Sequence, residues 1–462
     1  MSRHGNIKRI LPALAEKLGD RLSVSEAVRQ HHGTSLTYLA PALPEAVAFA
    51  HSTEEVSHII RLCNEADVPV MAFGTGTSLE GHFLATEGGL CIDLSGMDKI
   101  VSIHAEDLDA TVEAGVTRED LNHALRDMGL FFPIDPGANA SLGGMTATRA
   151  SGTNAVRYGT MRDNVLSLTA VMADGEIIRT KGRAKKSAAG YDLNALLTGS
   201  EGTLGIIMEI TLKLYGIPEA MSAAVCHFED LESAVKTVVE TIQTGIPVAR
   251  IELADALQMS LINKYSELDY AAKPTLFLEF HGSEQSVREQ AEIVGEIAAG
   301  QGSGDFRWAS RTEDRNKLWK ARHDAFYAVQ ANHPGKDFWA TDVCVPISRL
   351  TDCIMQTYDD IEKTGLVAPL VGHVGDGNFH LTLVFDKKDP AQVNRIEAFN
   401  GRLVERALKL EGTSTGEHGI GIGKKKFMTL EHGPALHYMQ AIKKALDPKN
   451  ILNPGKIFDL ED

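Results

Sequence analysis

Two histidines, His373 and His380, flank a glycine-rich segment that holds the dipeptide Asp376-Gly377. Asp-Gly is typical of a type I′ hairpin turn, because both central residues of that turn need φ > 0. A hairpin folded there pairs His373 with His380 on one face, with their Cβ atoms about 5 Å apart. Two imidazoles at this spacing suit one metal ion. The sequence therefore predicts a metal site on a hairpin, in which Asp376 forms the turn and does not bind the metal.

A carboxylate and a third imidazole follow in the segment Gly416-Glu417-His418-Gly419. Two neutral histidines and one glutamate can hold a divalent ion such as Zn²⁺ or Mn²⁺ and leave coordination positions open for a substrate. We predict that His373, His380 and Glu417 bind this metal. We predict that His418 is the catalytic base, since an unperturbed imidazole has a pKa near neutral pH. A lone histidine on a strand is more often structural, but two paired histidines followed by Glu-His favour a chemical role.

The composition is that of an ordinary globular protein with room for two or more domains. The chain has 462 residues, of which 43% are apolar and 23% charged. Its net charge of −16 argues against nucleic acid and anionic membranes as partners. The five scattered cysteines fit a reducing compartment. No apolar run approaches the ~20 residues of a transmembrane helix. We expect a cytoplasmic location, with a peripheral position at the inner face of the membrane as an alternative.

Helix and strand signals extend over the whole chain and change character near residue 217. A helix over 52–66 begins with a capping box at Ser52, and a buried strand over 68–73 follows it. Beyond 217 we expect helices at 230–243, 254–265, 283–300, 313–331, 347–363 and 389–410, and strands at 222–228, 248–252, 275–281, 338–345, 366–373 and 380–385. This alternation predicts an α+β layer, in which helices cover one side of an antiparallel sheet.

The strand over 68–73 leads into a glycine-rich loop, Gly74-Thr75-Gly76-Thr77-Ser78. A dinucleotide fingerprint G-x-G-x-x-G would need glycine at position 79, where the chain has Leu79. The loop still offers several backbone N–H groups and three hydroxyls, which suit a pyrophosphate. A second stretch, 133–160, is rich in small residues that cannot build a core. Long loops of this kind usually bind or cover a ligand, although a flexible loop is the alternative.

Taken together and in order, these segments resemble the FAD-binding domain of the vanillyl-alcohol-oxidase superfamily. The resemblance rests on 74–78, 136–144, 152–159 and 199–206. The two histidine motifs and the segment Asn453-Pro-Gly-Lys456 are similar to those of FAD-linked 2-hydroxy-acid dehydrogenases, nearest to the flavin D-lactate dehydrogenases. The implied fold is α+β. It joins a two-subdomain FAD-binding domain of the vanillyl-alcohol-oxidase type (1–217), an antiparallel-sheet substrate or cap domain covered by helices (218–417) and a short C-terminal helical segment (418–462).

The resemblance also implies a non-covalent FAD, held mostly by backbone groups of the glycine-rich loops. The implied cofactor-binding residues are Gly74, Thr75, Gly76, Thr77, Ser78, Pro136, Gly137, Gly143, Gly144, Ser151, Gly152, Gly159, Glu201, Gly202, Ile206 and Asn453. Glu201 has an alternative role, as an acid that caps a helix or fixes a loop.

The implied reaction is oxidation of a D-2-hydroxy monocarboxylic acid, D-lactate or similar, to the 2-oxo acid. The metal would orient the substrate and lower the pKa of its hydroxyl, His418 would take the hydroxyl proton, and the Cα hydrogen would pass to FAD as hydride. Arg322 resembles the carboxylate-binding arginine of the family, and its planar guanidinium suits that task. A surface position on the helix is the alternative for Arg322. Asn378 would bind the substrate or fix a ligand.

The run 338–342 bears on substrate choice. Relatives that act on dicarboxylates carry a basic residue just before its aspartate, but this chain has Phe-Trp-Ala-Thr-Asp there, which disfavours a second carboxylate. The alternatives are a dehydrogenase for another D-2-hydroxy acid (2-hydroxyglutarate or glycolate), a non-haem iron oxygenase and a non-catalytic flavin-binding module. Quinone, cytochrome c or an electron-transfer flavoprotein would accept the electrons.

Overall fold

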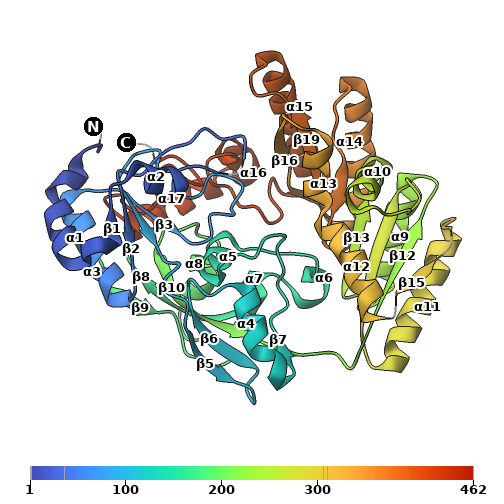
Figure 1. Ribbon diagram of the computed structural model, residues 1–462, viewed down its shortest axis with the longest axis horizontal. Coiled ribbons are helices and arrows are strands. Elements are labelled where there is room, and N and C mark those ends of the chain that lie inside the picture. The colour runs from blue at the N-terminus through green and yellow to red at the C-terminus, as the bar shows by residue number, and fades with distance from the viewer. Residues whose placement is uncertain (1–2, 36, 305, 310, 461–462) are drawn as a thin grey trace. The chain divides into compact units, whose positions relative to one another are not determined.

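The computed structural model describes residues 3–35, 37–304, 306–309 and 311–460. The chain divides into two compact units. Unit 1 consists of Met1–Ser151, Gly159–Ile217 and Glu417–Asp462, and unit 2 consists of Gly152–Tyr158 and Pro218–Gly416. In Figure 1 the ribbon of unit 1 is blue to green and dark red, whereas unit 2 is mainly yellow-green to orange.

Unit 1 contains two main sheets that share one hydrophobic core. The first has the order β1-β2-β4-β3, in which β2, β4 and β3 run parallel, and the second is antiparallel with the order β5-β6-β10-β8-β9. The strands of unit 1 are β1 (Leu22–Ser23), β2 (Ala46–Phe49), β3 (Val70–Phe73), β4 (Leu90–Asp93), β5 (Ile100–His104), β6 (Asp109–Glu113), β7 (Leu130–Phe131), β8 (Val165–Val171), β9 (Ile177–Arg179), β10 (Ile206–Lys213) and β11 (Tyr215–Gly216).

The helices of unit 1 follow the sequence signals closely. The helix expected over 52–66 is α3, and the hydroxyl of Ser52 accepts the N–H of Glu55 at its start, as the capping pattern predicts. The helices are α1 (Leu11–Leu18), α2 (Glu26–His31), α3 (Thr53–Ala66), α4 (Arg118–Leu125), α5 (Leu142–Thr148), α7 (Met161–Asn164), α8 (Leu193–Leu197), α16 (Met428–His432) and α17 (Ala435–Leu446), with short 3-10 turns at Asn6–Arg9, Gly19–Arg21, Arg126–Met128 and Lys425–Phe427.

Unit 2 is built on one antiparallel sheet with the strand order β15-β12-β14-β13-β18-β19-β16, and β17 pairs separately with β19. Its strands are β12 (Ala220–His227), β13 (Arg250–Ala254), β14 (Thr275–Gly282), β15 (Arg307–Ala309), β16 (Asp337–Ala340), β17 (Val343–Cys344), β18 (Leu370–Gly372) and β19 (Asn378–Phe385). Its helices are α6 (Ala155–Tyr158), α9 (Leu231–Gln243), α10 (Ala256–Ser266), α11 (Glu284–Gly300), α12 (Thr312–His323), α13 (Ala325–Asn332), α14 (Leu350–Thr364) and α15 (Pro390–Lys409), with 3-10 turns at Ile347–Arg349 and Val374–Asp376.

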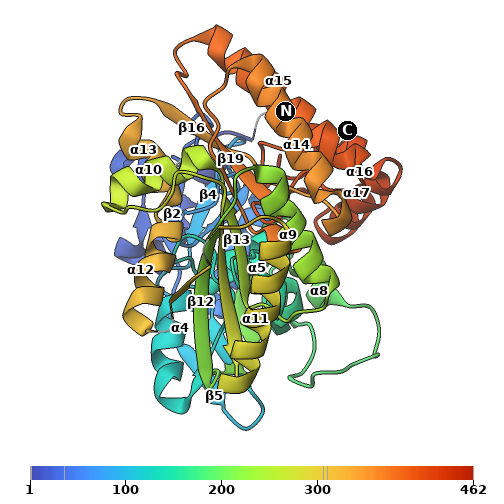
Figure 2. The same ribbon diagram turned by 90° about the vertical axis from the view of Figure 1, so that its right-hand side faces the viewer.

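Helices cover both faces of this sheet, so the expectation of a one-sided layer is wrong. On one face, Ala223, Val225 and Phe277 join a core with apolar side chains of α10, α12 and α13. The alternate residues of the same strands face the other way, where α9 and α11 contact β12, β13 and β14. Figure 2 shows α11 and α12 on opposite sides of β12. Because both faces of the sheet are buried, its strands carry continuous apolar runs such as Leu276–Leu278 in place of an alternating pattern.

Two predicted elements of unit 2 are interrupted. The helix expected over 313–331 is divided into α12 and α13 at Asp324, whose ψ of 0° departs from helical geometry. The strand expected over 338–345 is divided into β16 and β17, because Thr341 and Asp342 leave the ladder between them. Both residues are buried, and their polar groups bind side chains of the candidate site described below.

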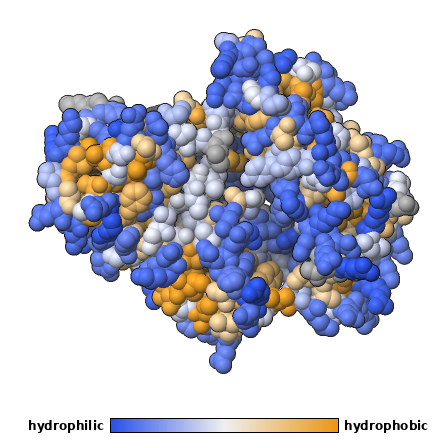
Figure 3. Space-filling model, viewed as in Figure 1, coloured by the Kyte–Doolittle hydropathy of each residue, from blue (hydrophilic) through white to orange (hydrophobic). Residues whose placement is uncertain are grey.

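The surface seen in Figure 3 is mostly hydrophilic, and its apolar residues form separate patches. Within the part of the chain that the structure describes, every helix is too short or too polar to span a bilayer.

A buried carboxyl in unit 2 predicts a measurable pH dependence of stability. Asp255 caps α10 by accepting the N–H of Gln258, accepts the hydroxyl of Tyr358, and has a pKa that burial raises from 3.8 to about 6. The folded state therefore holds a proton that the unfolded state has released, and this contribution to stability is lost as the pH rises through about 6. Asp255→Asn keeps the cap and removes the ionisation. We expect it to stabilise the protein by about 1–3 kcal/mol at pH 8, with little gain at pH 4.

Thermal unfolding of Asp255→Asn and of the natural protein at the two pH values measures this difference. Asp230→Asn at the exposed N-cap of α9 is the matched control, because that carboxylate makes the same kind of cap at the surface. A gain of equal size at pH 4 and pH 8 would contradict the assignment.

Candidate functional site

The predicted hairpin of histidines forms in unit 2, but with a different register. β18 pairs with β19 so that Val371 lies opposite His380. His373 therefore lies opposite Asn378, whose N–H donates to the carbonyl of His373 at 3.3 Å. The predicted pairing of His373 with His380 is wrong by two residues. Because side chains alternate with a period of two, both imidazoles still share one face, and their ring centroids lie 5.4 Å apart at an interplanar angle of 79°.

The turn between the two strands is also longer than a type I′ turn. A 3-10 turn over Val374–Asp376 precedes Gly377, which has φ 80°, whereas Asp376 is not in the left-handed region. A Cβ on Gly377 would lie 2.0 Å from the carbonyl oxygen of Val345. Gly377 is therefore required by the close approach of Val345, which directly follows β17 and is distant in sequence, as well as by its own φ.

Both imidazoles are held through Nδ1. The Nδ1 of His373 lies 2.8 Å from the carboxylate of Glu252, and the Nδ1 of His380 lies 3.0 Å from the carbonyl oxygen of Thr341. Carboxylate and carbonyl oxygens only accept, so each Nδ1 carries the hydrogen and each neutral ring keeps a lone pair on Nε2. Metal-binding histidines in proteins show this second hydrogen bond. The two histidines therefore fit the divalent ion that the sequence predicts.

Glu252 is a site residue that the sequence analysis missed. Leu253 of β13 lies opposite Gly372 of β18, so the next residues, Glu252 and His373, face each other. Glu252 is 1% exposed. Burial alone would raise the pKa of its carboxyl, but its electrostatic interactions with His373 and Arg322 and the hydrogen bonds that both side chains donate outweigh burial and hold the pKa below its usual value. The available signal was one acidic residue between the apolar Ile251 and Leu253, because such residues are rarely buried without a partner.

Arg322 of α12 is buried rather than on the surface, so its surface alternative is wrong. The side chain is 8% exposed, and its guanidinium donates to the second carboxylate oxygen of Glu252 at 2.5 Å. The Nε–H of Arg322 is buried and has no acceptor among the residues that the structure describes. An unsatisfied buried donor costs about 1–3 kcal/mol. A ligand carboxylate is the natural acceptor for this group.

Asn378 is bound within the site. Its side-chain amide donates to the carboxylate of Asp342 at 2.8 Å and to the carbonyl of Val343 at 2.9 Å. The second oxygen of Asp342 accepts the hydroxyl of Thr415 at 2.7 Å. Since both amide hydrogens of Asn378 are used, this geometry fits its alternative role, which is to fix neighbouring groups. A Cβ on Gly416 would lie 2.2 Å from the amide nitrogen of Asn378, so only glycine fits there.

Glu417 and His418 are the first residues of unit 1 after unit 2 ends at Gly416. Consecutive Cα atoms are about 3.8 Å apart. Glu417 is therefore one peptide bond, and His418 two, from the glycine that packs on Asn378 beside the histidine hairpin. This covalent link limits how far the predicted third ligand and the predicted base can lie from the hairpin.

Within unit 1, Glu201 fixes the backbone that follows His418. Its carboxylate oxygens accept the N–H groups of Ile420 at 2.7 Å and Gly421 at 2.8 Å, and they lie 3.4 Å from the imidazole of His82. Burial would raise the pKa of Glu201, but the attraction to His82 and the amide hydrogen bonds lower it overall. The carboxylate of Glu201 therefore has the loop-fixing role that was its alternative.

The backbone N–H groups of the loop Gly74–Ser78 are available to a ligand. Among the described residues, none of its backbone N–H groups donates a hydrogen bond to the protein. Gly76 has φ 68°, and the hydroxyls of Thr75 and Thr77 lie 3.3 Å apart. Unpaired amides beside hydroxyls at the end of a strand suit phosphate oxygens. This loop therefore fits the pyrophosphate of FAD.

The other predicted cofactor residues differ in what their side chains or backbones do. Gly143 is needed for packing, since a Cβ there would lie 2.6 Å from the Cβ of Ala114, and its N–H donates to the carbonyl of Ala114. The amide of Asn453 donates to the carbonyls of His82 and Glu201, while its Oδ1 is buried without a donor among the described residues. That oxygen can accept a hydrogen bond from a ligand. Gly152 belongs to unit 2, and the other predicted cofactor residues belong to unit 1.

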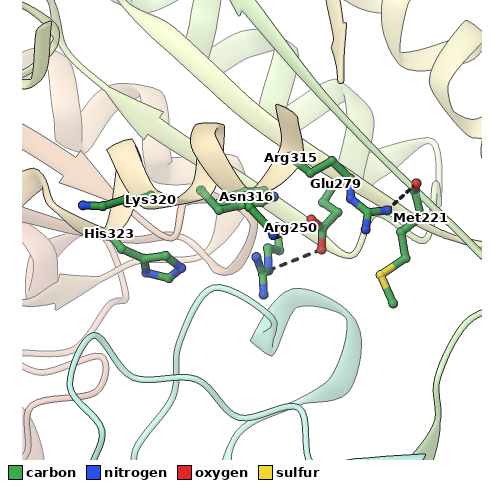
Figure 4. Close-up of a pocket in the computed structure, with 8 residues that line it drawn as sticks. Met221, Arg250, Glu279, Arg315, Asn316, Lys320 and His323 are labelled. Atoms are coloured by element: carbon green, nitrogen blue, oxygen red, sulfur yellow. Dashed lines mark hydrogen bonds and ion pairs between the residues drawn. The ribbon is translucent and has the colours of Figure 1, made fainter. Parts of the chain in front are cut away.

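A cavity of about 510 Å³ lies on the same face of the unit 2 sheet as Glu252. Arg250, two residues before Glu252 on β13, contributes to its wall, and its guanidinium stacks on the ring of Trp319 at 4.6 Å. Trp319 precedes Arg322 by one turn of α12. Figure 4 shows Arg250 paired with Glu279 and the α12 residues along one side of this cavity.

Two family models match the chain. A model described as FAD linked oxidases, C-terminal domain, matches residues 217–457, and a model described as FAD binding domain matches residues 44–181. Among solved structures, p-cresol methylhydroxylase superposes with a TM-score of 0.81 at 19% identity, covering 99% of this chain and 98% of that one. This likeness confirms the predicted fold of the vanillyl-alcohol-oxidase type.

Curated relatives are similar along nearly the whole chain. A probable mitochondrial D-lactate dehydrogenase of Danio rerio is 50% identical over 98% of this chain and 92% of that protein. A mitochondrial D-lactate dehydrogenase [cytochrome] of Arabidopsis thaliana is 45% identical over 97% of this chain and 80% of that protein. Because these relatives are named mitochondrial, the prediction of a cytoplasmic location is wrong. The predicted FAD-dependent enzyme class is confirmed, and the chain belongs to the family of FAD-linked oxidases.

Proposed function

We propose that this protein oxidises D-lactate to the corresponding 2-oxo acid with a bound FAD and a divalent metal. One observation carries the proposal: the carboxylate of Glu252 joins the imidazole of His373 to a buried arginine with an unsatisfied donor, Arg322. A site of this kind suits a small acid that carries a carboxylate and a neighbouring hydroxyl. The names of the relatives support D-lactate as that acid.

Each residue of the proposed site has a role that follows from its chemistry. Arg322 binds the substrate carboxylate through its guanidinium, whose fork matches two carboxylate oxygens. His418 accepts the hydroxyl proton at an imidazole nitrogen, while Glu201 holds the backbone after it. The loop Gly74–Ser78 would hold the FAD, which would supply the acceptor for the hydride from Cα.

His373 and His380 would hold the metal, with Glu417 as the third proposed ligand. The bound ion supplies orientation of the hydroxy acid and a lower pKa for its hydroxyl. Two imidazoles and a carboxylate suit Zn²⁺ or Mn²⁺. Glu252 and the carbonyl of Thr341 keep both rings in the tautomer that coordination needs.

A monocarboxylic substrate is the preferred one. Where dicarboxylate-specific relatives carry a basic residue, β16 has Trp339 and Ala340, and Trp339 is 5% exposed. The run 338–341 has no basic residue that could pair with a second carboxylate, and an unpaired buried charge is costly. We therefore expect kcat/KM for D-lactate to exceed that for D-2-hydroxyglutarate.

A spectrum of the purified protein tests the proposal. We expect a flavin band near ~450 nm that bleaches when D-lactate is added without oxygen. Bleaching should be lost in His418→Ala with flavin still bound, and after treatment of the natural protein with a chelator. A protein without a flavin band would overturn the proposal, and turnover that requires oxygen would favour the oxygenase alternative.

A c-type cytochrome is the proposed electron acceptor, because one relative carries the word cytochrome in its name. After reduction by D-lactate, the enzyme should pass electrons to cytochrome c faster than to a soluble quinone. Stopped-flow mixing of the reduced enzyme with each acceptor measures the two rates. Faster oxidation by the quinone would assign the acceptor differently.

A further inference from the structure

Glu252 uses its two carboxylate oxygens for two different side chains. One oxygen lies 2.8 Å from the Nδ1 of His373, and the other accepts from the guanidinium of Arg322 at 2.5 Å. The carboxylate is almost fully buried, at 1% exposure. These partners come from distant parts of the chain, the end of β18 and helix α12.

We propose that Glu252 is a positioning residue that orients the metal ligand His373 and the substrate-binding Arg322 at the same time. The inference rests on the proposed function and adds a coupling to it. Any change that turns the carboxylate of Glu252 moves both the imidazole and the guanidinium. Metal affinity and affinity for the substrate carboxylate are therefore linked through one side chain.

The donor and acceptor pattern explains why a carboxylate is needed. Arg322 can only donate, and a metal-binding His373 must donate through Nδ1, so both partners require an acceptor. Glutamine in place of Glu252 offers one acceptor oxygen and one NH₂ group. That NH₂ group faces either Arg322, where two donors meet, or His373, where it favours the tautomer with a hydrogen on Nε2. Either arrangement disturbs one half of the site.

A neighbouring pair in the same sheet provides a matched control. Glu279 of β14 is also buried, at 5% exposure, and it binds a histidine and an arginine: His281 at 2.8 Å and Arg250 at 3.6 Å. Glu279→Gln therefore makes the same chemical change in the same kind of surroundings, with His281 and Arg250 as the partners in place of His373 and Arg322. A purely structural role for buried glutamates in this sheet would make both variants behave alike.

The test is calorimetric titration of Mn²⁺ into FAD-loaded protein that has been stripped of metal, together with KM for D-lactate. Glu252→Gln should weaken Mn²⁺ binding by about 10–100-fold, the usual effect of losing such a partner, and should raise KM. Glu279→Gln should leave the Mn²⁺ affinity within about threefold of the natural protein. Unchanged Mn²⁺ affinity and KM in Glu252→Gln would overturn the inference.

Two further measurements keep the outcomes separate. If Glu252→Gln does not fold, Glu252→Asp replaces it, because aspartate keeps the charge but is one methylene too short to reach both partners; the same losses are expected, and their absence overturns the inference. Failure of the natural protein to bind Mn²⁺ would overturn the proposed metal site and the inference with it. If the natural protein binds Mn²⁺ and the Glu252 variants show the same Mn²⁺ affinity and KM, the inference alone is overturned.

Discussion

Replacing His380 with alanine is expected to lower kcat/KM for D-lactate by on the order of 10³-fold while FAD remains bound. In the proposed site His380 would bind the metal through Nε2, because its Nδ1 donates to the carbonyl of Thr341. Loss of this ligand removes the ion that would orient the hydroxy acid and acidify its hydroxyl, an effect of several kcal/mol. The flavin loop Gly74–Ser78 lies in unit 1 and His380 in unit 2, so the flavin band should persist.

Metal analysis and anaerobic reduction by D-lactate measure the two effects of His380→Ala separately. The variant should contain little metal, retain its flavin and bleach far more slowly than the natural protein. His58→Ala on the exposed face of α3 is the control for replacing a histidine. If His380→Ala retains both metal and activity, His380 is not a ligand.

Replacing Arg322 with lysine is expected to raise KM for D-lactate by about 10²-fold with a small loss of stability, because lysine keeps the charge beside Glu252 but lacks the fork that binds two carboxylate oxygens. Alanine at the same position should have a second effect. It leaves the carboxylate of Glu252 buried beside His373 without its guanidinium, and breaking such a buried pair costs about 3–5 kcal/mol.

Steady-state kinetics of Arg322→Lys and thermal unfolding of Arg322→Ala provide the two readouts. Arg288→Lys on the exposed face of α11 controls for the exchange of arginine for lysine. An Arg322→Lys enzyme with KM within threefold of the natural value would contradict a carboxylate-binding role. An Arg322→Ala protein that unfolds at the natural temperature would show that Glu252 does not depend on this guanidinium.

The sequence alone was sufficient for features that depend on short-range chemistry. The capping pattern at Ser52 placed α3 correctly, because a hydroxyl three residues before an N–H forms a local bond. The ordered glycine-rich loops and the histidine motifs led to the FAD-linked family, which the family models bear out. Apolar periodicity placed most helices and strands of unit 2 within a few residues.

Features that depend on contacts between distant segments could not be predicted from the sequence. The Asp376-Gly377 pair suggested a two-residue turn, but Val345, directly after β17, packs against Gly377, and the longer turn shifts the register by two residues. Apolar runs showed that the strands of unit 2 are buried without showing that helices cover both faces of the sheet. A run buried on one face and a run buried on two differ only in their neighbours.

The types and order of residues determined the cofactor class, the pair of imidazoles and the Glu-His that follows them. Only the tertiary structure decided what holds those imidazoles. Glu252 meets His373 through the pairing of β13 with β18 and meets Arg322 through the packing of α12 on the sheet. Both contacts join residues at least 70 positions apart. A single sequence carries local propensities and spacings, whereas such contacts are selected by the packing of the whole unit.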